Sequence, residues 1–421
     1  MIETILLNQN ITLRCCRDSR FKQGCLSFQL VRPMAAGEAA KNALIPAVLL
    51  RGTNRHPSLR AITARLDELY GAAVSPLVRR VGDYQTVGLY CGFMDDRFAL
   101  PGDRVLEPMI DFLAELLLDS PQEEGGFLPS FVESEKRNLI ATIESELNDK
   151  RAYAMGRMLK SMCREDTFGL PRLGEKEQVA AIHPQELYRH YRQILRTAPI
   201  QIFYVGSADS ASVAESLRPL LAKLERQPEE LPSQTGFHSC EGREEVETME
   251  ISQGKLCMGF VTPITNRDPG FPAMQLLNAI FGAGMTSKLF VNVREKMSLC
   301  YFVGSGYYGS KGIVTVAAGI DFDKEQVTRQ EILRQLQLCK DGEITPEELT
   351  AAKEAILSSL RATHDAPGSI EAYYATAALS GMGMTTAEYM AQVEKVILEQ
   401  VVAAANTVQL HTTYFLKGGS Q

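Results

Sequence analysis

Apolar and polar residues recur along this chain with two distinct periods, and each period predicts one kind of element. Residues 25–31 and 87–93 alternate with a period of two, which is typical of strands in a sheet. Residues 58–70 place an apolar side chain every three or four positions, which predicts a helix that packs with one face and ends at Gly71. By the same reasoning, the predicted strands are 11–32, 74–80, 84–93, 199–206, 256–261 and 301–307. The predicted helices are 41–50, 58–70, 106–118, 129–148, 153–163, 184–195 and 210–226.

The order of predicted elements begins again after residue 250. The sequence from Leu277 repeats that from Leu66 at an offset of 211, and Pro346 opens a long helix as Pro129 does at an offset of 217. Several weak matches near one offset indicate a duplication more strongly than any single match. The sequence therefore predicts an α+β protein made of two similar domains, each a sheet packed with helices.

The boundary between the two predicted domains lies in an acidic segment. Residues 225–250 contain eight acidic residues and two arginines, so they contribute −6 to a net charge of −7. We expect an N-terminal domain at 1–226, a linker at 227–250 and a C-terminal domain at 251–421.

Composition and charge exclude several classes of protein. A net charge of −7 argues against a nucleic-acid binder that relies on a basic surface. The longest apolar run has seven residues, too few to cross a bilayer, and the N-terminus does not resemble a signal peptide. The nine cysteines include no Cys-x-x-Cys pair and most occupy apolar patterns, which predicts reduced, buried thiols and a cytoplasmic location.

Residues 282–301 combine a glycine-rich loop, a short helix and a strand. Gly282 and Gly284 allow backbone conformations closed to other residues, and a hydroxyl residue that follows can cap the helix. Arg294 and Tyr301 then bring a cation and a phenol toward one place. The alternative is a structural corner in which Arg294 pairs with a surface carboxylate.

This stretch resembles the C-terminal-domain signature of the pitrilysin/insulinase family of zinc metallopeptidases, which includes the mitochondrial processing peptidases. Residues 284–290, residues 293–296 and Tyr301 match the signature in order and spacing. The resemblance extends over nearly the whole chain. It implies two homologous domains with mostly antiparallel sheets that form a clam-like shell, the fold of the LuxS and mitochondrial processing peptidase metallopeptidases. It also implies that Arg294 and Tyr301 contact the substrate carbonyl region, and that Gly282 and Gly284 border the bound peptide.

The resemblance implies a zinc site in the N-terminal domain, but the matching positions hold the wrong residues. The family binds zinc through His-x-x-Glu-His and a later Glu. Counting back from a shared Gly-Thr pair places Ala43, Pro46 and Ala47 at the His, Glu and His positions, and Thr142 matches the later Glu. None of these four residues binds a metal or moves a proton. We therefore expect no metal in this chain, and zinc in a partner.

One other arrangement could hold a metal. His183, Glu186 and His190 are spaced to share one face of a helix. The simpler interpretation is a helix that begins at Pro184 and carries solvated polar residues.

Three functions remain open at this stage. The first is a non-catalytic subunit of a heteromeric zinc metallopeptidase, which supplies Arg294 and Tyr301 to a paralogous partner that carries His-x-x-Glu-His. The resemblance favours it, because small bacterial family members without the zinc motif are encoded beside a zinc-bearing partner. Some of them carry the label EF-P 5-aminopentanol modification-associated protein. The second is an inactive peptide-binding or scaffold protein of the same fold, and the third is an enzyme with an unrelated metal site. The expected partners are the zinc-bearing chain and a peptide, with a homodimer left open, and neither nucleic acid nor a membrane.

Overall fold

The computed structural model describes residues 2–8, 10–146, 148–238 and 240–419. The chain forms two compact units that do not follow the order of the sequence. Unit 1 contains residues 1–144, 171–233 and 364–376, and unit 2 contains residues 145–170, 234–363 and 377–421. Each unit thus takes one short segment from the other half of the chain.

Unit 1 is built on a six-stranded sheet in the order β1-β2-β8-β3-β5-β4. All neighbouring strands are antiparallel except β2 and β8, which are parallel. The strands are β1 (Ile2–Asn8), β2 (Ile11–Arg17), β3 (Gln23–Pro33), β4 (Ala73–Val81), β5 (Tyr84–Met94) and β8 (Ile200–Gly206).

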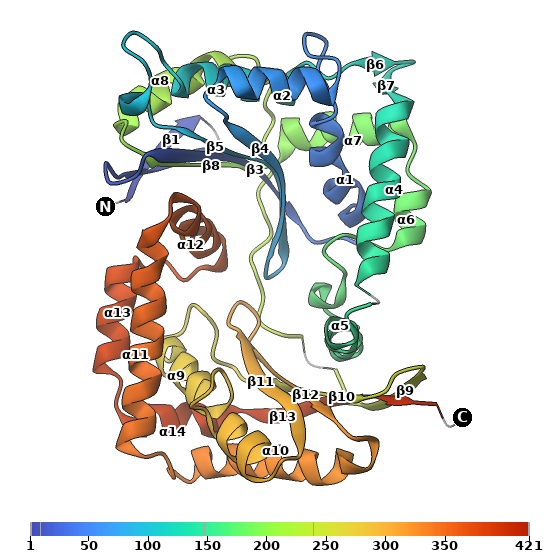
Figure 1. The fold of residues 1–421 in the computed structure, drawn as a ribbon, viewed down its shortest axis with the longest axis vertical. Helices are drawn as coiled ribbons and strands as arrows, with labels where there is room; N and C mark the ends of the chain where they lie inside the picture. Colours follow the sequence, from blue (N-terminus) through green and yellow to red (C-terminus); the bar gives the residue numbers. More distant parts are fainter. Residues whose placement is uncertain (1, 9, 147, 239, 420–421) are drawn as a thin grey trace. The chain divides into compact units, whose positions relative to one another are not determined.

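One face of this sheet is covered by helices of the N-terminal half (Figure 1). Because side chains alternate along a strand, Leu26, Phe28 and Leu30 of β3 all enter the same apolar core. The helices that contribute to this core include α1 (Ala39–Leu49), α3 (Leu106–Leu118), α7 (Pro184–Thr197) and α8 (Ser210–Leu221). The remaining helices of the N-terminal half are α2 (Leu59–Glu68), α4 (Pro129–Ser145), α5 (Lys150–Met162) and α6 (Lys176–Ala180).

The opposite face of the unit 1 sheet is covered by α12 (Pro367–Ser380), which comes from the C-terminal half. Glu371 on α12 is 1% exposed and lies against β3 and β4. Its carboxylate accepts two hydrogen bonds from Arg79, at 2.9 and 2.7 Å, and one each from Ser27 and Gln29, at 2.7 and 2.8 Å. A buried carboxylate is tolerated only when it is paired in this way, so these bonds fix the position of α12 on the sheet.

Unit 2 is built on a five-stranded sheet in the order β11-β12-β10-β13-β9. Only β13 and β9 are parallel. The strands are β9 (Glu244–Met249), β10 (Gly254–Val261), β11 (Cys300–Tyr308), β12 (Ile313–Ile320) and β13 (Gln409–Gly418). The helices of the C-terminal half, besides α12, are α9 (Phe271–Phe281), the π-helix η3 (Leu289–Lys296), α10 (Glu325–Lys340), α11 (Pro346–Ala362), α13 (Thr386–Lys395) and α14 (Leu398–Thr407).

One face of the unit 2 sheet is covered by α5, which comes from the N-terminal half. The helix lies so close to β10 that a Cβ at Gly259 would stand 2.5 Å from the sulfur of Met162 and 2.8 Å from that of Met158. The segment after α5 is fixed by a buried ion pair of 2.9 Å between Asp166 and Lys311, whose side chains are 1% and 0% exposed. In unit 2, as in unit 1, a segment from the other half of the chain covers one face of the sheet, and a buried carboxylate paired with a cation holds it there.

The two sheets share one strand order, which confirms the predicted α+β fold with homologous halves. Strands β2, β8, β3, β5 and β4 of unit 1 correspond in order and direction to β9, β13, β10, β12 and β11 of unit 2. The match between Leu66 and Leu277 was wrong in detail. Leu66 lies on the helix that leads directly into β4, whereas Leu277 lies on α9, one helix before the segment that leads into β11.

The chain passes from unit 1 to unit 2 within the acidic segment at 227–250, and hydrogen bonds attach this segment to each unit. Strand β9 occupies its end, and the described residues before β9 form no helix or strand. The Tyr84 hydroxyl donates to the Pro232 carbonyl at 2.6 Å within unit 1. Within unit 2 the Gln234 side chain donates to the Leu379 carbonyl at 2.6 Å. No helix in the described residues is long and apolar enough to cross a membrane.

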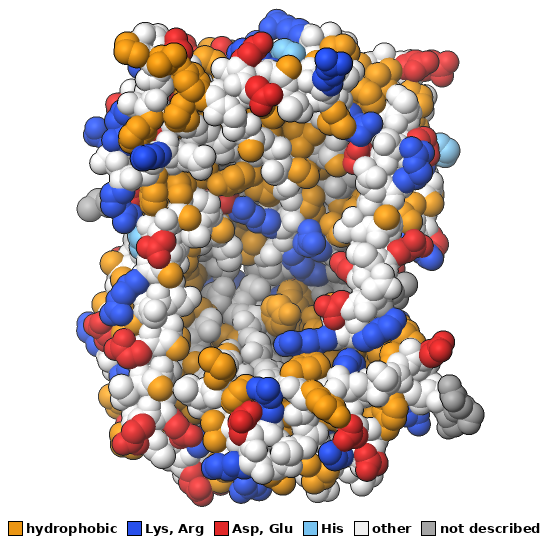
Figure 2. Space-filling view, in the orientation of Figure 1, with side chains coloured by type: hydrophobic (Ala, Val, Ile, Leu, Met, Phe, Trp, Pro, Cys, Tyr) orange, Lys and Arg blue, Asp and Glu red, His pale blue; other side chains and the backbone are white. Residues whose placement is uncertain are grey.

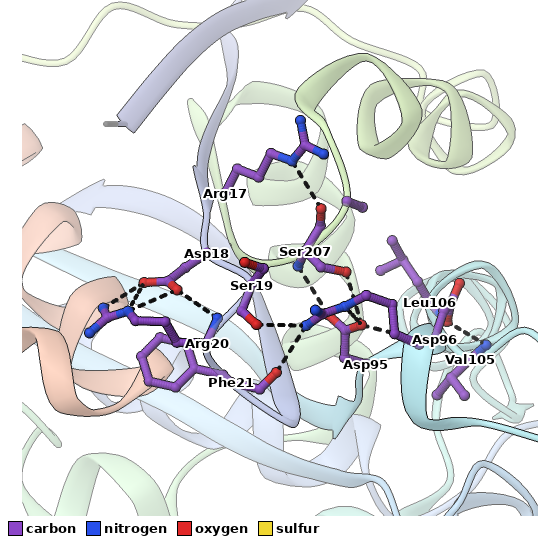
Figure 3. A network of polar contacts seen from close by, with 12 residues as sticks. Arg17, Asp18, Ser19, Arg20, Phe21, Asp95, Asp96, Val105, Leu106 and Ser207 are labelled. Atoms are coloured by element: carbon purple, nitrogen blue, oxygen red, sulfur yellow. Dashed lines mark hydrogen bonds and ion pairs between the residues drawn. The ribbon is translucent and has the colours of Figure 1, made fainter.

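A polar network joins the ends of two central strands of unit 1 (Figure 3). Asp95, which follows β5, is 4% exposed and accepts hydrogen bonds from the backbone and the hydroxyl of Ser207, at 3.0 and 2.9 Å. Burial alone would raise the pKa of Asp95, but the bonds from Ser207 and Arg97 outweigh it and hold the pKa below its usual value. The next residue, Asp96, accepts from the backbone of Val105 and Leu106 at the start of α3.

We predict that Glu371→Ala lowers the free energy of unfolding by about 3 kcal/mol, because it leaves Arg79, Ser27 and Gln29 without their common acceptor. Urea denaturation followed by circular dichroism measures this change. Glu354→Ala is the matched control, since Glu354 forms only an exposed pair with Arg361, and its effect should stay within about 0.5 kcal/mol. Equal effects of the two substitutions would show that α12 is not held by this carboxylate.

Candidate functional site

The glycine-rich loop after α9 is fastened to strand β11. The backbone N–H of Gly282 donates to the Asn278 carbonyl at 3.0 Å, and the Gly282 carbonyl accepts from the Ser305 N–H at 3.0 Å. The Ser305 hydroxyl also donates to the side-chain oxygen of the buried Asn278 at 2.7 Å. The loop is thus fixed against the strand on which Tyr301 lies.

The two glycines of this loop differ in what surrounds them. A Cβ at Gly282 would lie 2.7 Å from both a methyl of Leu289 and the hydroxyl of Ser305, so glycine is required there by packing. Gly284 has φ of +138° and nothing within 4 Å of the corresponding position. Of the two predicted substrate contacts, Gly284 has the open space that an approaching peptide needs.

The helix that follows is η3, and its turns are those of a π-helix. Ser287, 1% exposed, donates from its hydroxyl to the Gly284 carbonyl at 2.6 Å and accepts from the Phe290 N–H at 3.4 Å. Lys288 is 7% exposed and its ammonium lies 2.9 Å from both carboxylate oxygens of Glu348. Lys288 therefore holds η3 in place through its ion pair with Glu348.

Arg294 lies near the end of η3. Its guanidinium carbon is 4.6 Å from the centre of the Phe290 ring, and its side chain is 39% exposed. Its ion pair is with the adjacent Glu295 at 3.6 Å, and that carboxylate is 56% exposed. An aromatic ring thus supports the guanidinium while no buried carboxylate neutralises it.

Tyr301 is aimed by a β-bulge. In the pairing of β11 with β12, Cys300 lies opposite Ile320 and Phe302 opposite Gly319, so Tyr301 is the extra residue. Its side chain is 62% exposed, and its hydroxyl donates to Asp321 at 3.2 Å.

Arg294 and Tyr301 lie on opposite sides of the turn at 297–299. Within the described part of the chain they make no hydrogen bond or ion pair with each other, and each contacts different neighbours. The structure therefore places both groups at exposed positions on one unit but does not join them into a pair.

The four positions that match the zinc site carry no metal ligands in the fold. Ala43, Pro46 and Ala47 lie on α1, where Pro46 is an interior residue without an N–H to donate. Thr142 lies on α4, where its hydroxyl donates to the Asn138 carbonyl at 2.9 Å. Among the described residues, no group of three or more His, Cys, Asp or Glu side chains could hold a metal ion.

His190 on α7 is not solvated, contrary to the expectation for this residue, whereas His183 is exposed. His190 is 9% exposed, and its Nε2 donates to the side-chain oxygen of Asn42 at 2.7 Å. The amide of Asn42 donates in turn to Gln85 at 2.9 Å, while Glu186 pairs with Lys41 at 3.0 Å. His190 and Glu186 are thus engaged in separate contacts between α7 and α1, and the structure does not bring them together with His183 as a metal site.

Sequence reasoning also missed the role of Glu371. It is the only charged residue in the fourteen residues of α12, and an isolated charge in an otherwise apolar helix is a signal that could have been followed. His190 gave a signal as well, because it lies three residues after Leu187 and four before Ile194, on the apolar face of the helix. Its partner Asn42 could not be read from the sequence.

The comparisons with known proteins agree with this fold. The model described as "Peptidase M16 inactive domain" matches residues 181–356. A Bacillus subtilis (strain 168) protein named "Probable inactive metalloprotease YmfF" is 30% identical over 408 residues, covering 97% of this chain and 96% of that protein. An "Uncharacterized zinc protease" of Rickettsia felis is 24% identical over 263 residues, 61% of this chain and 62% of that one.

Two solved structures share the fold over the full chain. A conserved protein from Enterococcus faecalis V583 has a TM-score of 0.90 at 24% identity, covering 100% of this chain and 99% of that one. A "peptidase M16 inactive domain" from Pseudomonas fluorescens has a TM-score of 0.81 at 17% identity, covering 100% and 98%.

These findings define an α+β protein of the metallopeptidase type without metal ligands at the expected positions. The chain belongs to the M16 family of peptidases, the pitrilysin/insulinase family. It is a homologue of a probable inactive metalloprotease, and its own sequence lacks the family's zinc motif.

His190 should make stability depend on pH. Burial lowers the pKa of His190 to about 4, whereas an unfolded histidine titrates near 6.5. The unfolded state therefore binds the extra proton first, so this stability is complete above pH 6.5 and is lost as the pH falls toward 4. We expect a slope of up to about 1.4 kcal/mol per pH unit in that window.

His190→Gln keeps a donor for Asn42 but removes the titrating group, so it should flatten this slope between pH 4.5 and 6.5. Urea titrations at a series of pH values measure it. His183→Gln is the control, because His183 is an exposed residue at the start of α7. An unchanged slope in His190→Gln would assign the pH dependence to other groups.

Proposed function

We propose that this chain is the non-catalytic subunit of a heteromeric zinc metallopeptidase, and that Arg294 and Tyr301 act in an active site completed by a partner. One observation carries the proposal. The partly exposed Arg294 and the exposed Tyr301 are retained with their supporting loop, while all four zinc-site positions hold residues that cannot bind metal.

The environment of Arg294 supports a role outside the chain's own packing. A structural corner would pair Arg294 with a surface carboxylate, and Glu295 at 3.6 Å is such a partner. That pair leaves the guanidinium more open than the ammonium of Lys288, which is buried against Glu348 a turn and a half earlier. Arg294 remains 39% exposed beside an exposed neighbour, Glu295. Its positive charge is therefore available to a ligand, and the Phe290 ring restricts its orientation.

The environment of Tyr301 supports the same role. The bulge turns its side chain toward solvent, where an apolar ring is left 62% exposed. Its hydrogen bond to the exposed Asp321 is long, at 3.2 Å, and open to solvent, so a ligand can displace it. The hydroxyl is thus a donor that a bound peptide can recruit.

A peptidase must stabilise the negative charge that develops on the carbonyl oxygen of the substrate. A guanidinium and a phenol directed at that oxygen act in this way, and loss of one such donor costs roughly a hundredfold or more in turnover. The residues of this chain do not fit a zinc ion, so the partner would carry His-x-x-Glu-His and supply the metal. The pair would act on peptides. The nine cysteines of this chain are all free and mostly buried, which fits a protein of a reducing cytoplasm.

Arg294→Ala and Tyr301→Phe should each lower the turnover of the reconstituted pair about a hundredfold, while the melting temperature and partner binding stay unchanged. Arg294→Lys should restore turnover only in part, because an ammonium lacks the planar fork of a guanidinium. Steady-state kinetics with the zinc-bearing partner measure these effects.

Arg361→Ala and Tyr308→Phe are the matched controls, an exposed arginine of unit 2 and a tyrosine at the far end of β11. Loss of melting temperature with unchanged turnover would mean that Arg294 and Tyr301 are structural. Unchanged turnover and stability would favour the alternative, an inactive peptide-binding scaffold.

The chain alone should bind no stoichiometric zinc, because Ala43, Pro46, Ala47 and Thr142 offer no ligands. Elemental analysis after dialysis against a chelator tests this. About one zinc per chain that survives dialysis would contradict it and revive the hypothesis of an unrelated metal site.

A further inference from the structure

A polar pocket lies entirely within unit 2. Its volume is about 650 Å³, and it is formed by the start of α5, the segment before β10 and the first part of β11. Its lining includes Asp149, Arg151, Glu250, Gln253, Lys255 and Phe302. Phe302 immediately follows Tyr301 in the sequence.

The floor of this pocket is the ring of Phe302, which lies on the backbone of β12. A Cβ at Gly319 would stand 2.4 Å from the ring, so the absence of a side chain there lets the ring lie against the strand. The ring is also packed against the core between α5 and the sheet. It is therefore a fixed surface.

Two cations share this ring. The guanidinium carbon of Arg151 lies 4.5 Å from the ring centre, and the ammonium of Lys255 lies 5.6 Å from it. In the described residues neither side chain has a carboxylate within ion-pair distance, and the ammonium of Lys255 donates to the side-chain oxygen of the neutral Gln253. Figure 2 shows Lys and Arg side chains gathered over α5.

Two like charges held on one ring repel each other unless an anion lies between them. Burial lowers the pKa of Lys255, and the nearby Asp149 carboxylate offsets this effect only in part. The acidic residues of the lining supply a counter-charge only in part, since Asp149 acts on Lys255 without forming an ion pair with it. Asp149 accepts from the backbone of Arg151 and Ala152 at the start of α5, and Glu250 is exposed with no ion pair in the described structure.

We propose that this pocket binds a carboxylate of an extended peptide, either its C-terminal carboxylate or an Asp or Glu side chain. The proposal rests on the proposed function for the identity of the ligand, because a peptide is the ligand that this function assigns to unit 2. Arg151 and Lys255 pair with the carboxylate, and Phe302 holds both cations in place. The pocket thus selects acidic peptides among the substrates of the pair.

Binding to the purified chain without a partner tests this directly. Four fluorescent peptides of one length are compared by anisotropy: a neutral peptide with an amidated C-terminus, the same peptide with a free carboxylate, and two amidated peptides with an internal Glu or Gln. We expect one or both of the carboxylate peptides to bind about tenfold more tightly than the neutral counterpart, with the advantage reduced at high salt. Which of the two gains affinity identifies the source of the carboxylate.

Arg151→Gln and Lys255→Gln should each remove most of this advantage, whereas Lys417→Gln, an exposed lysine of the same unit, should not. Glu250→Gln should increase the advantage, because it removes a negative charge from the lining. Equal binding of carboxylate and neutral peptides, no binding of either carboxylate peptide, or no effect of Arg151→Gln and Lys255→Gln would overturn the proposal.

Turnover with the zinc-bearing partner separates this proposal from the previous one. With the amidated neutral peptide as substrate, Arg151→Gln and Lys255→Gln should leave turnover unchanged, while Arg294→Ala lowers it. If the pair has no activity but the charge preference persists, the pocket stands and the heteromeric peptidase fails. If activity depends on Arg294 but carboxylate and neutral peptides bind equally, the heteromeric peptidase stands and the pocket proposal fails.

Discussion

Both sheets in this protein are buried on two faces, and the second face of each depends on a helix from the other half of the sequence. Covering both faces of a sheet buries polar side chains as well as apolar ones. Glu371 with Arg79 in unit 1, and Asp166 with Lys311 in unit 2, satisfy those groups and decide where each exchanged segment lies. The rest of the structure follows from these two placements, because α12 and α5 complete the cores of their units.

The candidate site depends on the same arrangement in unit 2. Strand β11 carries Tyr301, and its neighbour β12 lies under α5 together with β10. The glycine loop is then fastened to β11 through Gly282, Asn278 and Ser305. A rigid strand, a fixed loop and a helix anchored by Lys288 thus form the frame from which the side chains of Arg294 and Tyr301 reach toward solvent.

The sequence predicts the individual elements well because their periods are strong. The strands at 74–80 and 84–93 are β4 and β5, and the helix at 129–148 is α4, which ends at Ser145. What the sequence could not show is which distant segment covers which face. Ser27 and Gln29 have the polar character of an exposed face, yet they are buried under Glu371, a residue 344 and 342 positions away. The loop and the order of Arg294 and Tyr301 are visible in the sequence, but the π-helix and the bulge that aim them are not, because each depends on one extra residue in a backbone pairing.

The exchange of α5 and α12 also has a consequence for how the protein is made. A ribosome releases the N-terminal half first, but the sheet of unit 1 keeps one face uncovered until α12 emerges, near the end of synthesis. The nascent chain must therefore expose the face of β3 that carries Cys25, Ser27 and Gln29 for most of its translation. Contacts that join residues so far apart slow folding, and an incomplete sheet is open to wrong pairing. The mixed polarity of that face, with hydroxyl and amide groups among its apolar residues, makes it a poorer template for aggregation than a fully apolar face would be.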